Sequence, residues 1–144
     1  MLKHEQGPAM KRYIILSIAL LLLLSLSLSA SGAREESEQT TTSYRRITAE
    51  EAKAMMDRLE DCIILDARSQ AEYDSGHIPG AIVIPHTEIN EKAPSLLKDK
   101  KQTILVYCRS GNRSKQASSA LARLGYTNVY EFGGIISWPY DIVK

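Results

Sequence analysis

The chain has 144 residues, of which 44% are hydrophobic and 24% charged, a balance that is ordinary for one folded domain. Its 18 basic and 17 acidic residues leave a formal net charge of +1. This near balance argues against a nucleic-acid-binding surface, which needs Lys and Arg clustered over one face, so any recognition of anions has to be local.

Residues 1–33 have the pattern of a segment that directs export. Lys11 and Arg12 precede an apolar run over residues 13–30, which small residues close at 31–33. This order is typical of a secretory signal peptide, here with cleavage after Ala33. The run is close to the lower limit of about 17 apolar residues for a membrane span, so an uncleaved anchor is the alternative. Both interpretations place the domain outside the cytoplasm, either as a periplasmic or extracellular protein or held at the membrane by this segment alone.

Residues 34–43 are rich in Glu, Ser and Thr and contain no aliphatic residue, so we predict a flexible linker before a domain over residues 44–144. The domain opens with a candidate strand over residues 44–47. Thr48 and Glu51 then fit a capping box, and apolar residues follow at helical spacing up to Leu59.

The rest of the domain alternates candidate strands and helices. Strands are expected over residues 62–66, 81–84, 103–107 and 128–130, with a short helical turn over 93–97 and a longer helix over 114–124 that ends at Gly125. Gly133 and Gly134 are expected to break the chain before residues 135–138. This alternation predicts an α/β fold with a mainly parallel central sheet of about five strands flanked by helices.

Ligands of such sheets bind beyond the carboxyl ends of the strands, where Asp66 and Cys108 are expected to lie. Cys62 is the second of the two cysteines, and it opens an apolar run in which a free Cys behaves as a small hydrophobe. We therefore predict a buried thiol at Cys62 and a free thiol at Cys108 rather than a disulfide. The three histidines are scattered, so a zinc site is not expected.

The segment after residues 103–107 has the residues of a reactive cysteine site. It reads Cys108-Arg109-Ser110-Gly111-Asn112-Arg113, before a helix expected to begin near Ser114. Backbone amides in such a turn form a nest that binds anions, and the helix N-terminus and two arginines add positive charge. Each of these favours a thiolate over a thiol, which predicts a nucleophile with a depressed pKa at Cys108. A buried structural Cys before a polar surface loop is the alternative, and it explains the arginines and the glycine poorly.

The same segment, extended to Ser114, resembles the active-site loop of single-domain rhodaneses. Three other motifs agree in order and spacing: Asp66-Ala67-Arg68 followed by Glu72-Tyr73, the run Gly76-His77-Ile78-Pro79-Gly80-Ala81, and Gly133-Gly134 with Trp138. Together they cover residues 44–140, nearly the whole predicted domain.

The resemblance implies a rhodanese-like fold and a sulfurtransferase that needs no metal or organic cofactor. The Cys108 thiolate would take sulfane sulfur from thiosulfate or a persulfide donor and pass it to a thiol or to cyanide. The small anionic donor would be bound by the rest of the loop, with Asp66 and Arg68 in support: Arg109, Ser110, Gly111, Asn112, Arg113 and Ser114.

The sequence pattern indicates a role for most of these residues and leaves the role of one open. Arg113 closes the loop and is the preferred residue for steering the anion, whereas Arg109 either contacts the substrate or points to solvent. Asp66 follows a buried strand and is expected to be buried and hydrogen-bonded. Arg68 is expected to form an ion pair with Glu72, and His77 to make a structural hydrogen bond rather than act as a base.

Two other function classes stay open. A persulfide carrier or sensor would act on a partner protein, with Ile135 and Ile136 either docking that partner or packing in the core. Phosphatases of the related fold use a cysteine and an arginine separated by five residues, whereas four residues separate Cys108 from Arg113. The shorter loop makes a smaller cradle, which argues against a phosphatase and, in the same way, against an arsenate reductase.

Overall fold

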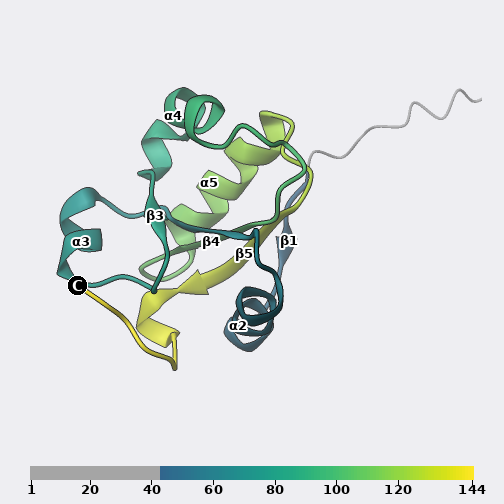
Figure 1. Cartoon of the computed structure of the whole chain (residues 1–144). Helices are drawn as coiled ribbons and strands as arrows, with labels where there is room; N and C mark the ends of the chain where they lie inside the picture. The colour runs from purple at the N-terminus through teal and green to yellow at the C-terminus, as the bar shows by residue number, and fades with distance from the viewer. Residues whose placement is uncertain (1–42) are drawn as a thin grey trace, which may run out of the picture. The chain divides into compact units, whose positions relative to one another are not determined.

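The structure, a computed structural model, describes residues 43–144, and the predicted export segment and nearly all of the predicted linker lie outside this range. Within the described residues, no helix has the length and apolar character needed to cross a membrane. The elements follow one another in this order (Figure 1): β1 (Arg45–Arg46), α2 (Ala49–Arg58), β2 (Ile63–Asp66), α3 (Gln70–Ser75), β3 (Ile82–Val83), the 3-10 helix η1 (His86–Glu88), α4 (Ile89–Leu96), β4 (Ile104–Cys108), α5 (Asn112–Arg123), β5 (Val129–Gly134) and the 3-10 helix η2 (Ile135–Ser137).

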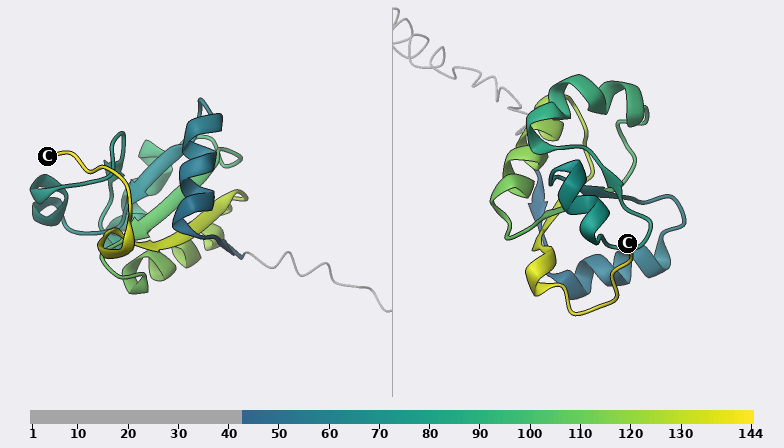
Figure 2. Two further views of the ribbon diagram at one scale, coloured as in Figure 1. Left: turned by 90° about the horizontal axis from the view of Figure 1, so that it is seen from below. Right: turned by 90° about the vertical axis from the view of Figure 1, so that its left-hand side faces the viewer.

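The five strands form one sheet in the order β1-β5-β4-β2-β3, and every neighbouring pair is parallel. Figure 2 shows α2 on one face of the sheet and α5 on the other. The central strand β4 is buried along its whole length, which explains its unbroken apolar sequence, because a parallel strand covered on both faces has no polar side. The predicted α/β fold with a parallel sheet of five strands is confirmed.

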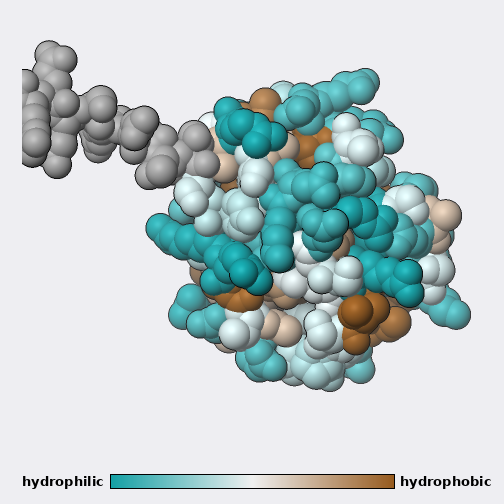
Figure 3. Space-filling model, turned by 180° about the vertical axis from the view of Figure 1, so that it is seen from behind, coloured by the Kyte–Doolittle hydropathy of each residue, from teal (hydrophilic) through white to brown (hydrophobic). Residues whose placement is uncertain are grey.

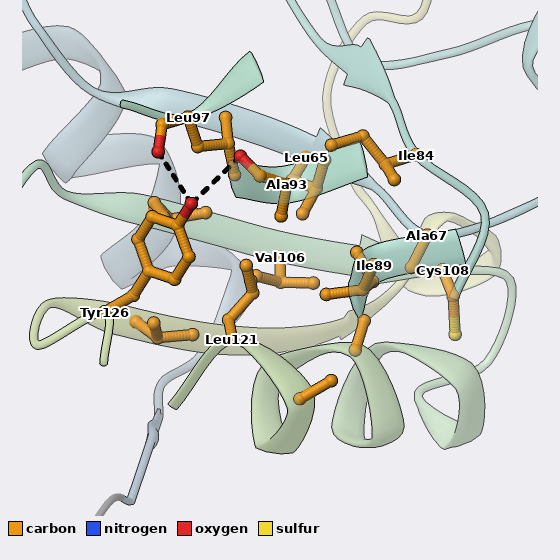
Figure 4. Close-up of a cluster of buried hydrophobic side chains, with 14 residues drawn as sticks. Leu65, Ala67, Ile84, Ile89, Ala93, Leu97, Val106, Cys108, Leu121 and Tyr126 are labelled. Atoms are coloured by element: carbon orange, nitrogen blue, oxygen red, sulfur yellow. Dashed lines mark hydrogen bonds between the residues drawn. The ribbon is translucent and has the colours of Figure 1, made fainter. Parts of the chain in front are cut away.

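Each face of the sheet packs against its own apolar cluster. On the α5 face, Ile104 and Val106 of β4 pack with Leu121 of α5, and on the α2 face Leu105 and Tyr107 pack with Phe132. Figure 4 shows the first cluster, with Tyr126 at one end and Cys108 at the other. The Tyr126 hydroxyl donates toward the carbonyl oxygens of Ala93 and Leu97, at 2.9 and 2.6 Å, which ties α4 to the segment after α5.

The structure corrects several predicted boundaries. Helix α5 begins at Asn112 rather than near Ser114, because Gly111 is its N-cap with a φ of 100° and completes the turn early. Strand β5 runs through Gly134, so the two glycines lie inside the strand instead of breaking the chain. There, pairing with β4 resumes after an irregularity, with Cys108 opposite Gly134. Helix α4 also begins earlier than expected, at Ile89, and includes Pro94.

Helix α3 is absent from the predicted elements, although its capping box was visible in the sequence. The Ser69 hydroxyl accepts from the Glu72 amide, and the Glu72 carboxylate accepts from the Ser69 amide. This is the same arrangement as at Thr48 and Glu51, where the predicted capping box of α2 is confirmed. The chain ends beside α3 (Figure 1), where Val143 forms an antiparallel bridge with His77.

Candidate active site

Cys108 is the last residue of β4, so the central strand delivers it to the carboxyl edge of the sheet. Its side chain is free and the residue is 1% exposed. The chain then turns over itself within residues 109–111, and the Gly111 amide donates back to Cys108 Sγ at 3.1 Å. Gly111 has a φ of 100°, a conformation that favours glycine. The turn therefore aims backbone amides at the sulfur.

At the Cys108 thiol, hydrogen bonds lower the pKa by more than burial raises it. Burial is the largest single influence and raises the pKa, because a thiolate in a dry site loses its hydration. The hydroxyl and the amide of Ser114 and the amides of Gly111 and Ser110 act in the opposite sense, and together they bring the pKa below its ordinary value. The thiolate is thus favoured by a nest of neutral donors at the start of α5, as expected for a reactive cysteine.

The end of β5 forms the floor of this loop. A Cβ on Gly134 would collide with the backbone of Arg109 and Ser110, so only glycine fits there. Ile136, two residues after Gly134, donates its backbone amide to the Arg109 carbonyl oxygen at 3.2 Å. The two segments therefore lie backbone to backbone, which fixes the loop against the sheet.

Arg113 is held by Glu72 of α3. Its Nη1 and Nη2 atoms donate to the two carboxylate oxygens at 2.6 and 2.7 Å, across side chains that are 28% and 33% exposed. This hydrogen bonding is the main reason that the pKa of Glu72 falls to about 2. The pKa of Arg113 is raised, first by Glu72 and more weakly by negative charge on Cys108. The guanidinium is therefore held by Glu72 through both of its Nη atoms.

Asp66 and Arg68 form a buried pair at the end of β2. Arg68 Nη2 donates to Asp66 Oδ2 at 2.7 Å and to the Gly76 carbonyl at 2.7 Å, and the Arg68 amide donates to Asp66 Oδ1 at 2.9 Å. The predicted pairing of Arg68 with Glu72 is wrong. The buried Asp66 carboxylate needs a cation beside it, and Glu72 points from α3 toward Arg113 instead. Asp66 is buried and hydrogen-bonded, as expected.

Glu131 is a buried acid beneath the loop that the sequence analysis did not identify. It lies on β5 and is 1% exposed. Its Oε1 accepts from Ser114 Oγ at 2.7 Å and from the Gly133 amide at 2.9 Å, and its Oε2 accepts from Arg46 Nε at 3.3 Å. The sequence did contain a signal for this burial. Glu131 lies two positions after the apolar Val129, and alternate residues of a strand share one face, so both are expected to point inward.

The rhodanese-like domain is the family whose model matches this sequence, over residues 48–139. The chain belongs to the rhodanese family. The thiosulfate sulfurtransferase PspE of Escherichia coli (strain K12) is 39% identical over 71 residues, which are 49% of this chain and 68% of PspE. The putative sulfur carrier protein YrkF of Bacillus subtilis (strain 168) is 34% identical over 95 residues, 66% of this chain and 50% of YrkF. A solved structure of a rhodanese with anions from E. coli has 36% identity and a TM-score of 0.54, covering 58% of this chain and 98% of that chain.

The predicted loop residues do come together around Cys108, but they differ in their exposure to solvent. Gly111 and Ser114 are buried, whereas Ser110 and Asn112 are exposed at the turn and at the start of α5. Arg109 is also exposed, and it forms no ion pair with any residue of the described part of the chain. Their part in binding substrate stays a prediction.

The structure also shows the surroundings of His77 and Cys62, two residues for which a structural role was predicted. His77 Nδ1 lies 3.0 Å from the Tyr73 carbonyl oxygen, and the His77 ring stacks on Tyr73 with 3.7 Å between centroids, so a structural hydrogen bond is confirmed. Cys62 is free but only half-buried, packed beside the cluster on the α2 face, and burial raises the pKa of its thiol. It precedes β2 at the amino edge of the sheet, opposite to the edge that holds Cys108.

Proposed function

We propose that this rhodanese is an enzyme that moves sulfane sulfur from thiosulfate or a persulfide donor to a thiophilic acceptor through a Cys108 persulfide. The observation that carries the proposal is the nest of donors around Cys108, from Gly111, Ser110 and the first turn of α5. The same donors that favour a thiolate suit the anions on either side of the reaction, namely thiosulfate and the bound persulfide.

The chemistry takes two steps. The Cys108 thiolate attacks the outer sulfur of thiosulfate, the sulfur–sulfur bond of the donor breaks, and sulfite leaves with the electron pair. The enzyme then holds a Cys–S–S⁻ group in the nest. Cyanide or a thiolate attacks its outer sulfur in the second step, so that thiocyanate or a new persulfide leaves and the Cys108 thiolate returns. Covalent storage of the sulfur between the steps predicts ping-pong kinetics.

The described activity of similar proteins supports this proposal. PspE is a thiosulfate sulfurtransferase that shares two thirds of its length with this chain. The E. coli rhodanese structure is described with anions, which agrees with a family member that binds small anions. The positive charges of Arg109, which is exposed, and of Arg113, whose pKa responds to the charge of Cys108, would attract a dianionic donor.

The test is thiocyanate formation from thiosulfate and cyanide by the purified domain. The Cys108→Ser variant is expected to fall to the uncatalysed rate, while the matched Cys62→Ser variant retains wild-type turnover because Cys62 lies at the other edge of the sheet. Double-reciprocal plots at several cyanide concentrations are expected to be parallel. Full transfer by Cys108→Ser would refute the proposed mechanism.

A persulfide carrier or sensor that acts on a partner protein is the second candidate. Ile136 favours it, because this residue is 69% exposed and its amide bonds to the active loop. Figure 3, a view from behind, shows a small apolar patch at the lower right of a largely hydrophilic face. YrkF, a putative sulfur carrier, is a relative of this kind. A Cys108 persulfide that survives purification, seen by mass spectrometry as one added sulfur without thiosulfate, would favour the carrier.

Phosphatase and arsenate reductase activities are weaker candidates. Four residues separate Cys108 from Arg113, and Ser114 takes the place where a longer loop would have its arginine. The Arg113 fork is occupied by Glu72, which leaves it poorly placed to clamp a phosphate. Aryl phosphate hydrolysis without thiosulfate turnover would reverse this ranking.

We also propose that the domain works outside the cytoplasm, on the basis of residues 1–33 alone. N-terminal sequencing of the protein recovered from its native host tests this proposal. A mature chain that begins at Arg34 indicates a cleaved signal peptide, and an intact N-terminus in the membrane fraction indicates an anchor. Recovery of the intact chain from the cytosol would overturn both.

A further inference from the structure

Glu131 is a carboxylate that the sulfur-transfer steps above do not use, yet it lies directly beneath the active loop. A Cβ on Gly111 would lie 3.7 Å from Glu131 Oε1, so the carboxylate is under the N-cap of α5. The strand places it there, since β5 pairs with β4 on one side and with β1 on the other. Burying a carboxylate is costly unless it is hydrogen-bonded and paired, and Glu131 meets this cost chiefly with two neutral donors, Ser114 and Gly133.

Glu131 has the weakest counter-charge among the three carboxylates around Cys108. Asp66 has the buried Arg68 beside it at 2.7 Å. Glu72 has the bidentate Arg113. The partner of Glu131 is Arg46, which approaches only to 3.3 Å with a side chain that is 68% exposed. Much of the Glu131 charge is therefore left to act on the loop.

The Ser114 hydroxyl has one proton and several acceptors around it. Its Oγ lies 2.7 Å from Glu131 Oε1, 3.0 Å from the Gly111 carbonyl oxygen and 3.3 Å from the Gly133 carbonyl oxygen. Donation from the same hydroxyl is also among the causes that lower the pKa of Cys108. A hydroxyl donates to one acceptor at a time. An ionised carboxylate at the shortest distance is the strongest of the oxygen acceptors. The Ser114 hydroxyl is thus directed at Glu131, and any donation to the Cys108 thiolate has to compete with this carboxylate.

We propose that Glu131 is a positioning residue that draws the Ser114 hydroxyl away from Cys108 and so keeps the sulfur a stronger nucleophile than the nest alone would leave it. A thiolate with fewer donors is more basic, and the nucleophilicity of thiolates rises with their basicity. When negative charge moves to the outer sulfur of the persulfide, the inner sulfur no longer needs this donor. The inference rests on the proposed function for the reaction that Cys108 performs, but its test needs no sulfur donor.

Glu131→Gln and Arg46→Gln make a matched pair of variants. The Glu131→Gln change keeps an oxygen that can accept from Ser114 and Gly133 but removes the charge, so this oxygen competes less strongly and more of the Ser114 donation goes to the sulfur. Arg46→Gln removes the cation that partly offsets Glu131. If the charge of Glu131 acts on Cys108, the apparent pKa of Cys108 falls in the first variant, by about one unit, and rises in the second. A merely structural pair would move both variants in the same direction, because each loses the same ion pair.

The measurement is the rate of iodoacetamide alkylation of Cys108 against pH, made in a Cys62→Ser background. The alkylation profile of Glu131→Gln is expected to shift to lower pH, and the high-pH limiting rate constant to fall about threefold for a one-unit shift. Arg46→Gln is expected to shift the profile the other way. An unchanged profile for Glu131→Gln, or shifts of the same sign in both variants, would overturn the inference. Should Glu131→Gln fail to fold by circular dichroism, the absence of an upward shift in Arg46→Gln overturns it alone.

Failure of this inference and failure of the proposed function give different results. A protein that does not transfer sulfur still shows the opposite alkylation shifts if Glu131 acts as proposed. A sulfurtransferase in which Glu131 is only structural shows thiocyanate formation without those shifts.

Discussion

At the scale of single residues, the charged side chains around Cys108 form ion pairs, and these differ from the pair that the sequence pattern predicts. Arg68 and Glu72 are four positions apart and were expected to pair. The fold instead gives Arg68 to Asp66 and Glu72 to Arg113, because burial of Asp66 demands the nearer cation. The place of Cys108 at the end of a strand was predictable, because it depends on the local sequence. The place of Glu131 beneath the loop was not, because it depends on which strand lies there.

Glu72→Gln tests the pair that holds Arg113. The folded pKa of Glu72, about 2, lies below its ordinary value of 4.5, so the ionised form is stabilised by folding. That contribution is fully present above pH 4.5 and is lost as the pH falls toward 2. After allowance for the exposure of both side chains, we expect Glu72→Gln to lower the free energy of unfolding by about 1 kcal/mol at pH 7. Urea unfolding at pH 7 and near pH 2 measures the difference, and a gap that persists undiminished near pH 2 contradicts the assignment.

At the scale of elements, helix α3 shows that a short helix can act on the site through its cap. Ser69 Oγ and the Ser69 amide both bond to Glu72 Oε2, at 3.0 and 3.1 Å, and the same carboxylate holds Arg113. Ser69→Ala is therefore expected to cost about 1 kcal/mol of stability and to raise KM for thiosulfate, because Glu72, which holds Arg113, loses the hydroxyl bond and keeps only the bond from the amide.

Thr48→Ala on α2 is the matched control for Ser69→Ala. It removes the same kind of capping box from a helix whose cap does not contact the loop. We expect a similar loss in melting temperature with KM unchanged. Equal effects of the two variants on KM would show that the cap of α3 has no special connection to the site.

The end of β5 gives a second prediction at this scale. Gly134 has an ordinary extended backbone, with φ −139° and ψ 150°, so only the space beside Arg109 excludes a side chain. Gly134→Ala is expected to push the loop off the sheet, abolish sulfur transfer and cost about 1–3 kcal/mol. Gly125→Ala is the control: its φ of 89° is strained for alanine, but no atom lies within 4 Å of the new Cβ. It is expected to lose stability and keep activity, as measured by thermal melts and thiocyanate formation.

The elements themselves were predictable where the signal is local, and less so where pairing decides. The capping box of α2 and the apolar run of β4 fixed these elements from the sequence, and α3 had the same box at Ser69 and Glu72. The true end of β5 was not visible. Glycines usually interrupt a strand, but here Gly134 is retained in the sheet by its approach to the loop after Cys108. The start of α5 shifted for a similar reason, since Gly111 turns the chain sooner than the polar sequence indicates.

At the scale of the whole molecule, ion pairs connect the segments that meet at the carboxyl edge of the sheet. Asp66 and Arg68 fasten the end of β2 to Gly76, the second pair joins α3 to α5, and Glu131 with Arg46 joins β5 to β1. Of these pairs, the first is the most deeply buried. It therefore bears on the stability of the entire domain rather than on one loop.

Arg68→Met leaves the buried Asp66 carboxylate without its cation, and we expect the free energy of unfolding to fall by about 3–5 kcal/mol. The double variant Asp66→Asn with Arg68→Met removes the charge as well, so it is expected to recover part of that loss. The comparison separates the cost of an unpaired charge from the loss of packing and of the bond to the Gly76 carbonyl, because both variants lose these equally. Urea unfolding of the two proteins gives the difference. If the double variant is no more stable than Arg68→Met, the pair acts through packing and hydrogen bonding, and its charge contributes little to holding β2 against the segment that begins at Gly76.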